Sequence, residues 1–220
     1  AGATCALAEN GADVAGLDIE PRRLEMARER ARARGLEIPL RVADITDAST
    51  LHDFEGPWDL ILFRDVLEHI PDVDATLEQC TERLAGDGAI VVIYPPYWSP
   101  YGGHQQTLRL KSRLGLRWAK LPFVHWLPLP LWRSLAEAGE VQGDEWEDIS
   151  IVRRARLTIG GVSRRARQHG LTVSRSRRYL LRPTFRLRYG TPVLGAGPLG
   201  RIPGVREICV TGAWELLRRR

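Results

Sequence analysis

The sequence predicts an α/β protein built around a doubly wound parallel sheet. Residues 59–63 (DLILF) and 89–94 (AIVVIY) are unbroken apolar runs, which are typical of strands buried on both faces of a parallel sheet. Segments with helical spacing of apolar residues precede and separate these runs. Strands that alternate with helices at this interval indicate a doubly wound fold.

The first strand of the chain is expected within residues 11–20 (GADVAGLDIE). Its apolar positions are Val14, Leu17 and Ile19. Asp18 stands at the carboxyl end of this strand, and residues 4–10 fit a helix that leads directly into it. Because a nucleotide-binding unit opens with a strand rather than a helix, we expect its first strand to lie before Ala1, in a chain truncated at its amino terminus.

Three further elements follow in the expected sheet core. A helix covers residues 21–35, a strand covers residues 39–43, and a second helix covers residues 73–84. Asp44 directly follows the strand at 39–43. Open α/β sheets bind ligands beyond the carboxyl ends of their strands, so Asp18 and Asp44 are candidate binding residues.

Residues 97–148 interrupt this alternation. The segment mixes aromatic and proline residues and is longer than an ordinary connection, so we expect a cap that covers the substrate. Regular structure is expected again as a helix at 159–169 and a strand at 171–181. A stretch rich in Gly and Pro follows at 183–203, and a last strand is expected at 208–217.

Charge is distributed unevenly over the three expected parts, which are a nucleotide-binding core at 1–96, a cap at 97–148 and a C-terminal completion of the core at 149–220. Residues 1–95 carry 9 basic and 19 acidic side chains, whereas residues 149–220 carry 17 arginines and 2 acidic side chains. A GC-rich genome would explain the excess of arginine. The alternative is a surface for an anionic partner, such as a phosphorylated substrate, a membrane leaflet or a nucleic acid.

Cysteine spacing and hydropathy narrow the class of protein further. Cys5, Cys80 and Cys209 are isolated, so the sequence indicates neither a disulfide framework nor a CxxC metal site. No apolar run approaches the ~18 residues of a membrane-spanning helix. We therefore expect a cytoplasmic protein in a reducing environment.

Four motifs stand in order along residues 11–96. They are GADVAGLDIEP, VADITD, FEGPWDLILFRDVLEHIPD and LAGDGAIVVIYPP. In this combination the chain resembles class I S-adenosylmethionine (SAM)-dependent methyltransferases of type 11. The nearest group contains the quinone-biosynthesis O-methyltransferases, which carry a similar Glu-His segment after the same strand. The resemblance implies a Rossmann-like sheet, a cap insertion after the fifth strand, a C-terminal antiparallel strand pair, and SAM as the cofactor.

The resemblance places seven residues around the cofactor. They are Gly2, Asp18, Ile19, Asp44, Ile45, Arg64 and Asp65. Asp18 would accept hydrogen bonds from the ribose hydroxyls, with Ile19 against the adenine. Asp44 would accept a hydrogen bond from the adenine amino group, beside the backbone of Ile45. From the residues alone, Asp18 could instead cap the helix that follows it.

The other three residues belong to the remaining parts of the cofactor site. Arg64 and Asp65 would lie near the methionine end of SAM. Gly2 matches the last glycine of the family's glycine-rich loop, which lets the backbone approach the cofactor closely.

Methyl transfer from a sulfonium requires an acceptor held in line, and a general base helps when the acceptor is a hydroxyl or a protonated amine. His104 and His69 are the candidate bases. Residues that could orient the acceptor are Tyr97, Tyr101 and Gln105. The alternative for His69 is packing beneath the DVLEH turn, and the alternative for His104 is packing within its loop.

A metal site is a further interpretation of the DVLEH segment. Asp65, Glu68 and His69 carry ligand types that suit Mg, Mn or Zn, and Asp65 and His69 are four residues apart. Similar Glu-His segments occur in family members that need no metal, so we expect no metal here.

The cap suggests a type of acceptor. Residues 114–132 (LGLRWAKLPFVHWLPLPLW) are apolar, aromatic and interrupted by proline, with Arg117 and Lys120 able to stay in water. Either this is an ordinary lid, or it contacts the inner face of a membrane and serves a lipid-linked or amphiphilic acceptor. In the second case arginines within 153–188 would meet headgroup phosphates. A nucleic acid is not favoured, because no RNA-binding module accompanies the arginines.

The sequence therefore predicts a SAM-dependent methyltransferase of a small or amphiphilic molecule. One alternative is an NAD-dependent oxidoreductase on a similar fold, since an acid after the strand that ends at Asp18 would suit either cofactor. The other is a non-catalytic nucleotide-binding module. The DVLEH turn, Asp44 and the late strand pair favour the methyltransferase. The acceptor atom stays open among oxygen, nitrogen and carbon.

Overall fold

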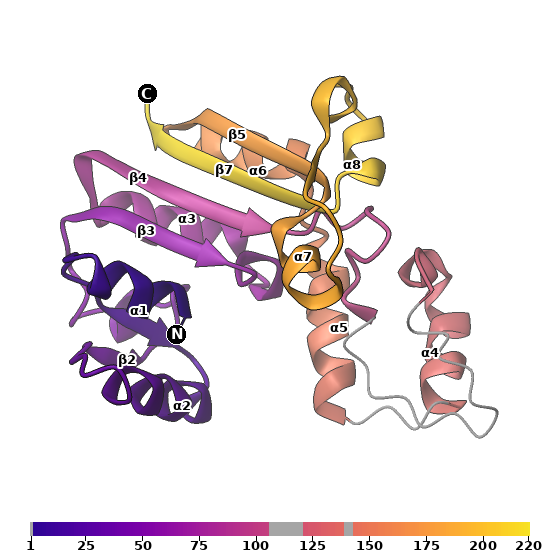
Figure 1. Cartoon of the computed structure of the whole chain (residues 1–220). Helices are drawn as coiled ribbons and strands as arrows, with labels where there is room; N and C mark the ends of the chain where they lie inside the picture. Colours follow the sequence, from indigo (N-terminus) through magenta and orange to yellow (C-terminus); the bar gives the residue numbers. More distant parts are fainter. Residues whose placement is uncertain (1, 106–120, 139–142) are drawn as a thin grey trace. The chain divides into compact units, whose positions relative to one another are not determined.

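The structure is a computed structural model that describes residues 2–105, 121–138 and 143–220 of the chain. The chain divides into two compact units, residues 1–55 and residues 56–220 (Figure 1). The division into core, cap and C-terminal completion remains a prediction. Its first boundary, after residue 96, lies inside the second unit, and its second, after residue 148, lies inside a helix.

Unit 1 is a βαβ unit preceded by a helix. Its elements are α1 (Gly2–Glu9), β1 (Gly16–Asp18), α2 (Pro21–Arg32), β2 (Leu40–Val42) and the 3-10 turn η1 (Ala48–Thr50). β1 and β2 pair in parallel, with α2 as the crossover. Leu24 and Ala31 form the buried face of α2, and Gly35 has a φ of 68°, which lets the chain turn away after the helix.

The strand expected at 11–20 is present but is less buried than the sequence suggests. Gly16, Leu17 and Asp18 are all half-buried, and 67% of Ile19 is exposed. The reason is that β1 pairs only with β2 among the described residues, so it lacks a neighbour along its other edge. Full burial of a parallel strand requires partners on both sides and covered faces.

Unit 2 contains a five-stranded sheet with the order β3-β4-β7-β5-β6 (Figure 1). Its strands are β3 (Trp58–Arg64), β4 (Leu84–Tyr94), β5 (Leu171–Leu181), β6 (Leu194–Gly195) and β7 (Gly212–Arg219). Its helices are α3 (Val73–Glu82), α4 (Leu129–Ala138), α5 (Gly143–Ala155), α6 (Ile159–Gln168), α7 (Pro183–Tyr189) and α8 (Val205–Cys209). Its 3-10 turns are η2 (Leu67–His69), η5 (Val124–Trp126) and η6 (Gly197–Gly200).

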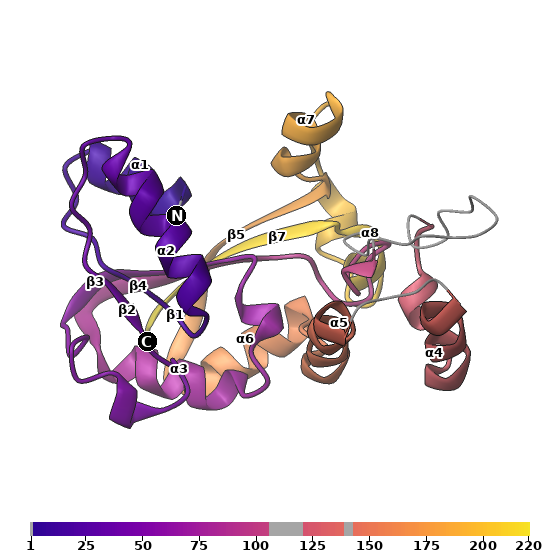
Figure 2. The ribbon, with the colours of Figure 1, turned by 90° about the horizontal axis from the view of Figure 1, so that it is seen from below.

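The sheet of unit 2 is mixed. β3 and β4 pair in parallel, whereas β7 pairs antiparallel with both β4 and β5. β4 supplies the centre of the core, since Ile90, Val92 and Tyr94 are fully buried. α3 and α6 contact each other and lie on one face of the sheet (Figure 2). The predicted C-terminal antiparallel strand pair is therefore present as β5 and β7.

Two sequence predictions in unit 2 need correction. The run DLILF does not form a strand buried on both faces, because β3 is an edge strand in the described sheet and 42% of Leu60 is exposed. The last strand begins at Gly212 rather than at Ile208, which belongs to α8. Val210 and Thr211 connect α8 to β7.

The region expected as a cap contains turns and helices in its described parts. Residues 97–105 form successive turns, η5 and α4 follow, and α5 packs against η2. Arg117 and Lys120 lie outside the described residues. In the described ranges, none of the helices combines the length and the apolar character needed to cross a membrane.

Candidate functional site

The predicted nucleoside-binding residues of unit 1 lie at one edge of a two-stranded parallel sheet. The register pairs Gly16 with Leu40 and Asp18 with Val42, and the Ala43 N–H donates to the Asp18 carbonyl over 3.2 Å. Asp44 therefore stands two residues beyond the partner of Asp18. Parallel pairing brings both carboxylates to the carboxyl edge of β1 and β2, where open α/β sheets bind ligands.

Asp18 uses one carboxylate oxygen locally. Its Oδ1 accepts a hydrogen bond from the Glu20 N–H over 2.9 Å. The N-cap of α2 is Glu20, whose Oε1 accepts from the Arg22 N–H. The alternative that Asp18 caps the helix is therefore wrong. In the described part of the chain, Oδ2 of Asp18 takes no hydrogen bond, which leaves it for another donor.

Asp44 is fixed by the turn that follows β2. Its Oδ1 accepts hydrogen bonds from the N–H and the hydroxyl of Thr46 at 2.8 and 2.7 Å. The Thr50 hydroxyl accepts from the Asp44 N–H and donates to the Asp44 carbonyl. These contacts orient the half-buried carboxylate of Asp44 and keep the half-buried Ile45 beside it.

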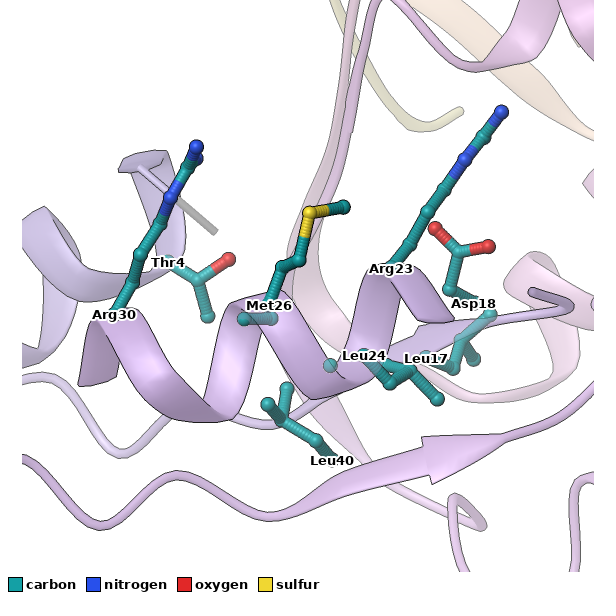
Figure 3. Close-up of a pocket in the computed structure, with 10 residues that line it drawn as sticks. Thr4, Leu17, Asp18, Arg23, Leu24, Met26, Arg30 and Leu40 are labelled. Carbon is teal, nitrogen blue, oxygen red and sulfur yellow. The ribbon is translucent and has the colours of Figure 1, made fainter. Parts of the chain in front are cut away.

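An open pocket of about 250 Å³ lies against α2 in unit 1 (Figure 3). Leu17, Leu24 and Leu40 give it an apolar floor, with Asp18 and Arg23 at one end. The pocket contains one of the predicted binding residues, Asp18. The others in this unit do not line it; they are Gly2, Ile19, Asp44 and Ile45.

Gly2 opens α1, and a Cβ added to it would meet nothing within 4 Å. The structure therefore gives no steric reason for glycine at this position. A bound cofactor close to the backbone would supply one, so the role of Gly2 remains a prediction.

A second cluster of predicted residues follows β3 in unit 2. Arg64 is the exposed last residue of β3, and Asp65 has a φ of 51°, a conformation that costs a non-glycine residue free energy. Oδ1 of Asp65 accepts from Nη1 of Arg182 at 2.9 Å, and the guanidinium lies 5.5 Å from the ring centroid of Phe185. Asp65 is thus tied to the residue that directly follows β5.

Glu68, His69 and His104 form a cluster of titratable side chains in unit 2. Glu68 is 1% exposed, and its carboxylate oxygens take no hydrogen bond from the described residues. Nε2 of His104 lies 3.5 Å from Oε1 of Glu68. The rings of His69 and His104 meet edge to face at 4.7 Å. A buried carboxylate is expensive unless a charge or proton compensates it, and His104 is placed to do so.

The loop that carries His104 is held in place by close packing. Side chains at Gly102 and Gly103 would overlap the Pro96 carbonyl and the His125 side chain respectively, so only glycine fits there. His104 itself has a φ of 57°. Nε2 of the buried His125 donates to the Tyr97 carbonyl over 2.7 Å, and burial lowers the pKa of His125 to about 4.

The three predicted acceptor-orienting residues differ in their surroundings. Tyr97 is 3% exposed and its ring meets those of Trp98 and His125. Gln105 is fully buried and donates from Nε2 to the Pro100 and Leu121 carbonyls. Both stabilise the loop in this structure, and acceptor contact by either remains a prediction.

Tyr101 is the most accessible of these three residues. It is half-buried, and its ring lies 6.5 Å from the Phe185 ring, edge to face. Tyr101 therefore brings the loop after β4 and the helix after β5 together at the carboxyl edge of the sheet.

Three residues of this cluster were not assigned a role in methyl transfer from the sequence. Arg182 is a polar residue directly after β5, which is the same sequence signal that marks Asp18 at the end of β1. The sequence suggests Glu68 only as a metal ligand, because its burial depends on tertiary packing, in which η2 contacts α5. The contact of His125 with the Gly103 backbone is tertiary, so no local sequence pattern predicts it.

The same cluster contains the group of side chains that could hold a metal ion in the described part of the molecule. One ligand atom each from Glu68, His69 and His104 lies within 4.8 Å of the others. Two imidazoles and a carboxylate suit Zn²⁺ or another divalent transition metal. Asp65, the third ligand in the metal interpretation of the sequence, is paired with Arg182 instead.

Comparison with protein families identifies a methyltransferase domain over residues 2–121. The match covers more than half of the chain. The chain therefore belongs to the methyltransferase domain family, and the resemblance expected from its motifs is confirmed.

Among curated proteins, the ubiquinone biosynthesis O-methyltransferase of Xylella fastidiosa (strain 9a5c) is 32% identical over 87 residues, which is 40% of this chain and 35% of that protein. The protein of the same name from Chelativorans sp. (strain BNC1) is 31% identical over 116 residues, which is 45% of each. The chain thus spans less than half the length of these curated relatives.

Solved structures of methyltransferases share the fold. A SAM-dependent methyltransferase from Methanosarcina mazei superposes with a TM-score of 0.57 at 13% identity, covering 97% of this chain and 85% of that one. Geranyl diphosphate C-methyltransferase from Streptomyces coelicolor A3(2) gives a TM-score of 0.55 at 14% identity, covering 98% and 67%. The predicted α/β methyltransferase fold is confirmed.

Proposed function

We propose that the chain is a SAM-dependent methyltransferase that acts on a small or amphiphilic acceptor by in-line displacement. The observation that carries this proposal is the parallel register of β1 and β2, which brings Asp18 and Asp44 to one sheet edge in a chain of the methyltransferase domain family. Two acids after paired strands suit the ribose and the adenine of a single nucleoside.

The residues of unit 1 fit the nucleoside of SAM. Oδ2 of Asp18 is available to ribose hydroxyls, and the exposed side chain of Ile19 offers an apolar surface to adenine. Asp44 and Ile45 stand on the adjacent strand end and would contact the adenine edge. Gly2 is proposed to belong to this part of the cofactor site, whereas the roles of Arg64 and Asp65, which belong to unit 2, stay predictions from the resemblance. When bound, SAM supplies an electrophilic methyl group on a sulfonium.

The acid–base chemistry is assigned to His104. Its Nε2 faces the buried carboxylate of Glu68, so an Nε2–H donor directed there leaves Nδ1 as the proton acceptor. Nδ1 would take the proton that an acceptor hydroxyl loses on methylation, while the bond between the methyl carbon and the sulfonium sulfur would break and S-adenosylhomocysteine would leave. Glu68 positions the ring and stabilises the imidazolium that results, as in other carboxylate–histidine pairs. His69, which stacks edge to face on His104, is the second candidate base.

We infer that the acceptor atom is oxygen and that the acceptor is amphiphilic. The names of the curated relatives support a hydroxyl on a quinone-like molecule. Tyr101 and Phe185 offer aromatic surface beside the Arg182 guanidinium, which suits a planar acceptor with an anionic group. Tyr97 and Gln105 are proposed to hold the loop that faces it. A lipid-linked acceptor would bring a cytoplasmic protein into peripheral contact with the inner face of the membrane.

Isothermal titration with S-adenosylhomocysteine and, separately, with NAD⁺ tests the proposed cofactor. We expect a saturable heat signal with S-adenosylhomocysteine and none with NAD⁺. Binding of NAD⁺ alone would favour the oxidoreductase alternative. Binding of neither ligand by the full-length protein would favour a non-catalytic module.

A further inference from the structure

The segment that follows β5 exposes an unusual number of large apolar side chains. Residues 183–204, called here the 183–204 segment, contain α7, β6 and η6. Its exposed apolar side chains are Leu187 (82%), Tyr189 (67%), Leu194 (50%), Ile202 (47%), Leu199 (43%) and Val193 (39%). Apolar surface concentrated in one segment in this way marks an interaction site on most soluble proteins.

The charge of the segment is of one sign. No acidic residue occurs between Ile149 and Arg206, and Arg186, Arg188 and Arg201 are all exposed. In the described part of the chain, none of these three arginines forms an ion pair. The exposed leucines and Tyr189 are therefore interleaved with unpaired positive charge.

The two acids that follow the segment along the chain, Glu207 and Glu215, are already engaged. Glu207 accepts hydrogen bonds from the Ile159 and Gly160 N–H groups at the start of α6, both over 2.9 Å. Glu215 is fully buried and takes a hydrogen bond from Tyr94. The positive charge of the 183–204 segment is thus left for a partner outside the chain.

α7 is held by contacts in its first turn, and its later residues are exposed. Phe185 contacts the Arg182 guanidinium, and its ring lies 6.0 Å from that of Tyr189. Arg182 in turn pairs with Asp65. α7 projects from the end of β5 on the face of the sheet opposite to α3 and α6 (Figure 2). A helix anchored in this way can present Leu187 and its flanking arginines without unfolding.

We propose that the 183–204 segment docks on an anionic membrane leaflet. Leucine and tyrosine side chains would enter the boundary between headgroups and acyl chains, and the arginines would contact lipid phosphates. Charge complementarity favours this occupant, because the surface combines apolar side chains with arginines and carries no acid. The contact surface thus differs from the cap at 114–132 that the sequence suggests. The inference rests on the proposed function in one respect, because membrane contact would give the enzyme access to an amphiphilic acceptor.

Co-sedimentation with vesicles tests the proposal without cofactor or acceptor. The wild-type chain is expected to bind phosphatidylglycerol-containing vesicles, and to bind phosphatidylcholine vesicles much less. The double variant Leu187→Ser/Tyr189→Ser should bind the anionic vesicles about tenfold more weakly, since it loses two interfacial anchors. Both side chains are more than half exposed, so the fold should tolerate the change, which circular dichroism checks.

Two control variants locate the surface. Arg175→Gln/Arg177→Gln removes two exposed arginines of β5, and Arg186→Gln/Arg188→Gln removes two from α7. Both change the net charge equally, but only the second should weaken vesicle binding strongly. Leu121→Ser, at a residue 56% exposed in the cap region, should leave binding unchanged.

Several outcomes would overturn the proposal. They are absence of wild-type binding to anionic vesicles, equal losses in the two arginine pairs, and a loss in Leu121→Ser that matches the α7 variant. Dimerisation that Leu187→Ser/Tyr189→Ser abolishes, without vesicle binding, would instead identify a second copy as the occupant. Titration with S-adenosylhomocysteine on the same variants is independent, so failure of either proposal can be recognised separately.

Discussion

Nε2 of His104 lies 3.5 Å from Oε1 of Glu68, although β4 separates the two residues along the chain. Glu68 is a buried residue of η2, and His104 directly follows Gly103 with a φ of 57°. A buried carboxylate beside an imidazole holds the ring in one orientation and favours its protonated form during proton transfer. The pair thus joins the motif after β3 to the loop after β4.

His104→Gln is expected to lower kcat by about 100-fold or more, because the proposed general base is removed. Glu68→Gln should lower kcat less and should change the pH profile of kcat, since it removes a positioning carboxylate and not the base. Steady-state assays from pH 6 to pH 9 measure both effects. His52→Gln, at an exposed histidine of unit 1, is the control. Wild-type kcat and pH profile in both variants would contradict the assignment.

Glu215 should make the protein less stable as the pH rises toward neutrality. Burial raises the pKa of Glu215 to about 7 from 4.5, despite the Tyr94 hydrogen bond and Arg178. The folded protein therefore keeps a proton that the unfolded chain releases above pH 4.5. The free energy of unfolding falls between about pH 4.5 and pH 7, by about 3 kcal/mol from this group. Urea unfolding of Glu215→Gln should show a gain relative to wild type at pH 8 and none at pH 4.5. A pH-independent difference would contradict this.

His125 should change the free energy of unfolding with pH in the direction opposite to Glu215. Burial lowers the pKa of His125 to about 4 from 6.5, so the unfolded chain takes up a proton before the folded chain does. The free energy of unfolding then falls as the pH drops from about 6.5 to about 4, by about 3 kcal/mol from this group. In the wild type this effect offsets that of Glu215. In His125→Gln the free energy of unfolding should therefore fall more steeply between about pH 4.5 and pH 7, as Glu215 alone predicts. His52→Gln should leave the pH dependence of the wild-type free energy of unfolding unchanged. Identical profiles in all three proteins would count against it.

Metal removal should not affect the proposed activity. Glu68, His69 and His104 could bind a divalent ion, but the proposed chemistry uses His104 as a base and needs no metal. Methyl transfer in the presence of EDTA is expected to equal the untreated rate. Loss of activity that Zn²⁺ or Mn²⁺ restores would replace the base assignment by a metal centre.

Local patterns in the sequence predicted most of the fold. The strand at 171–181 and the helix at 159–169 match β5 and α6 almost residue for residue, because their period and caps are local properties. Burial was predicted less well. The β3 run is apolar enough for a central strand, but burial depends on which strands flank it, and that is decided by tertiary pairing.

The residues of the candidate site likewise fall into those that local sequence patterns predict and those that depend on tertiary packing. Asp18 and Asp44 could be found because each ends a recognisable strand, whereas the environment of Glu68 arises from packing between distant segments. The Arg182–Asp65 pair likewise depends on the order of strands in the sheet, which places the exits of β3 and β5 at one edge. The sequence therefore identifies the residue types of the candidate site but not their partners in the folded protein.

The affinity of Asp18→Ala for S-adenosylhomocysteine tests the central claim most directly. Isothermal titration should show at least about tenfold weaker binding than wild type, since the ribose hydroxyls would lose their proposed acceptor. Asp13→Ala, at an exposed acid outside the predicted site, should bind like wild type. Equal affinity in all three proteins would contradict the assignment of this strand end to the cofactor.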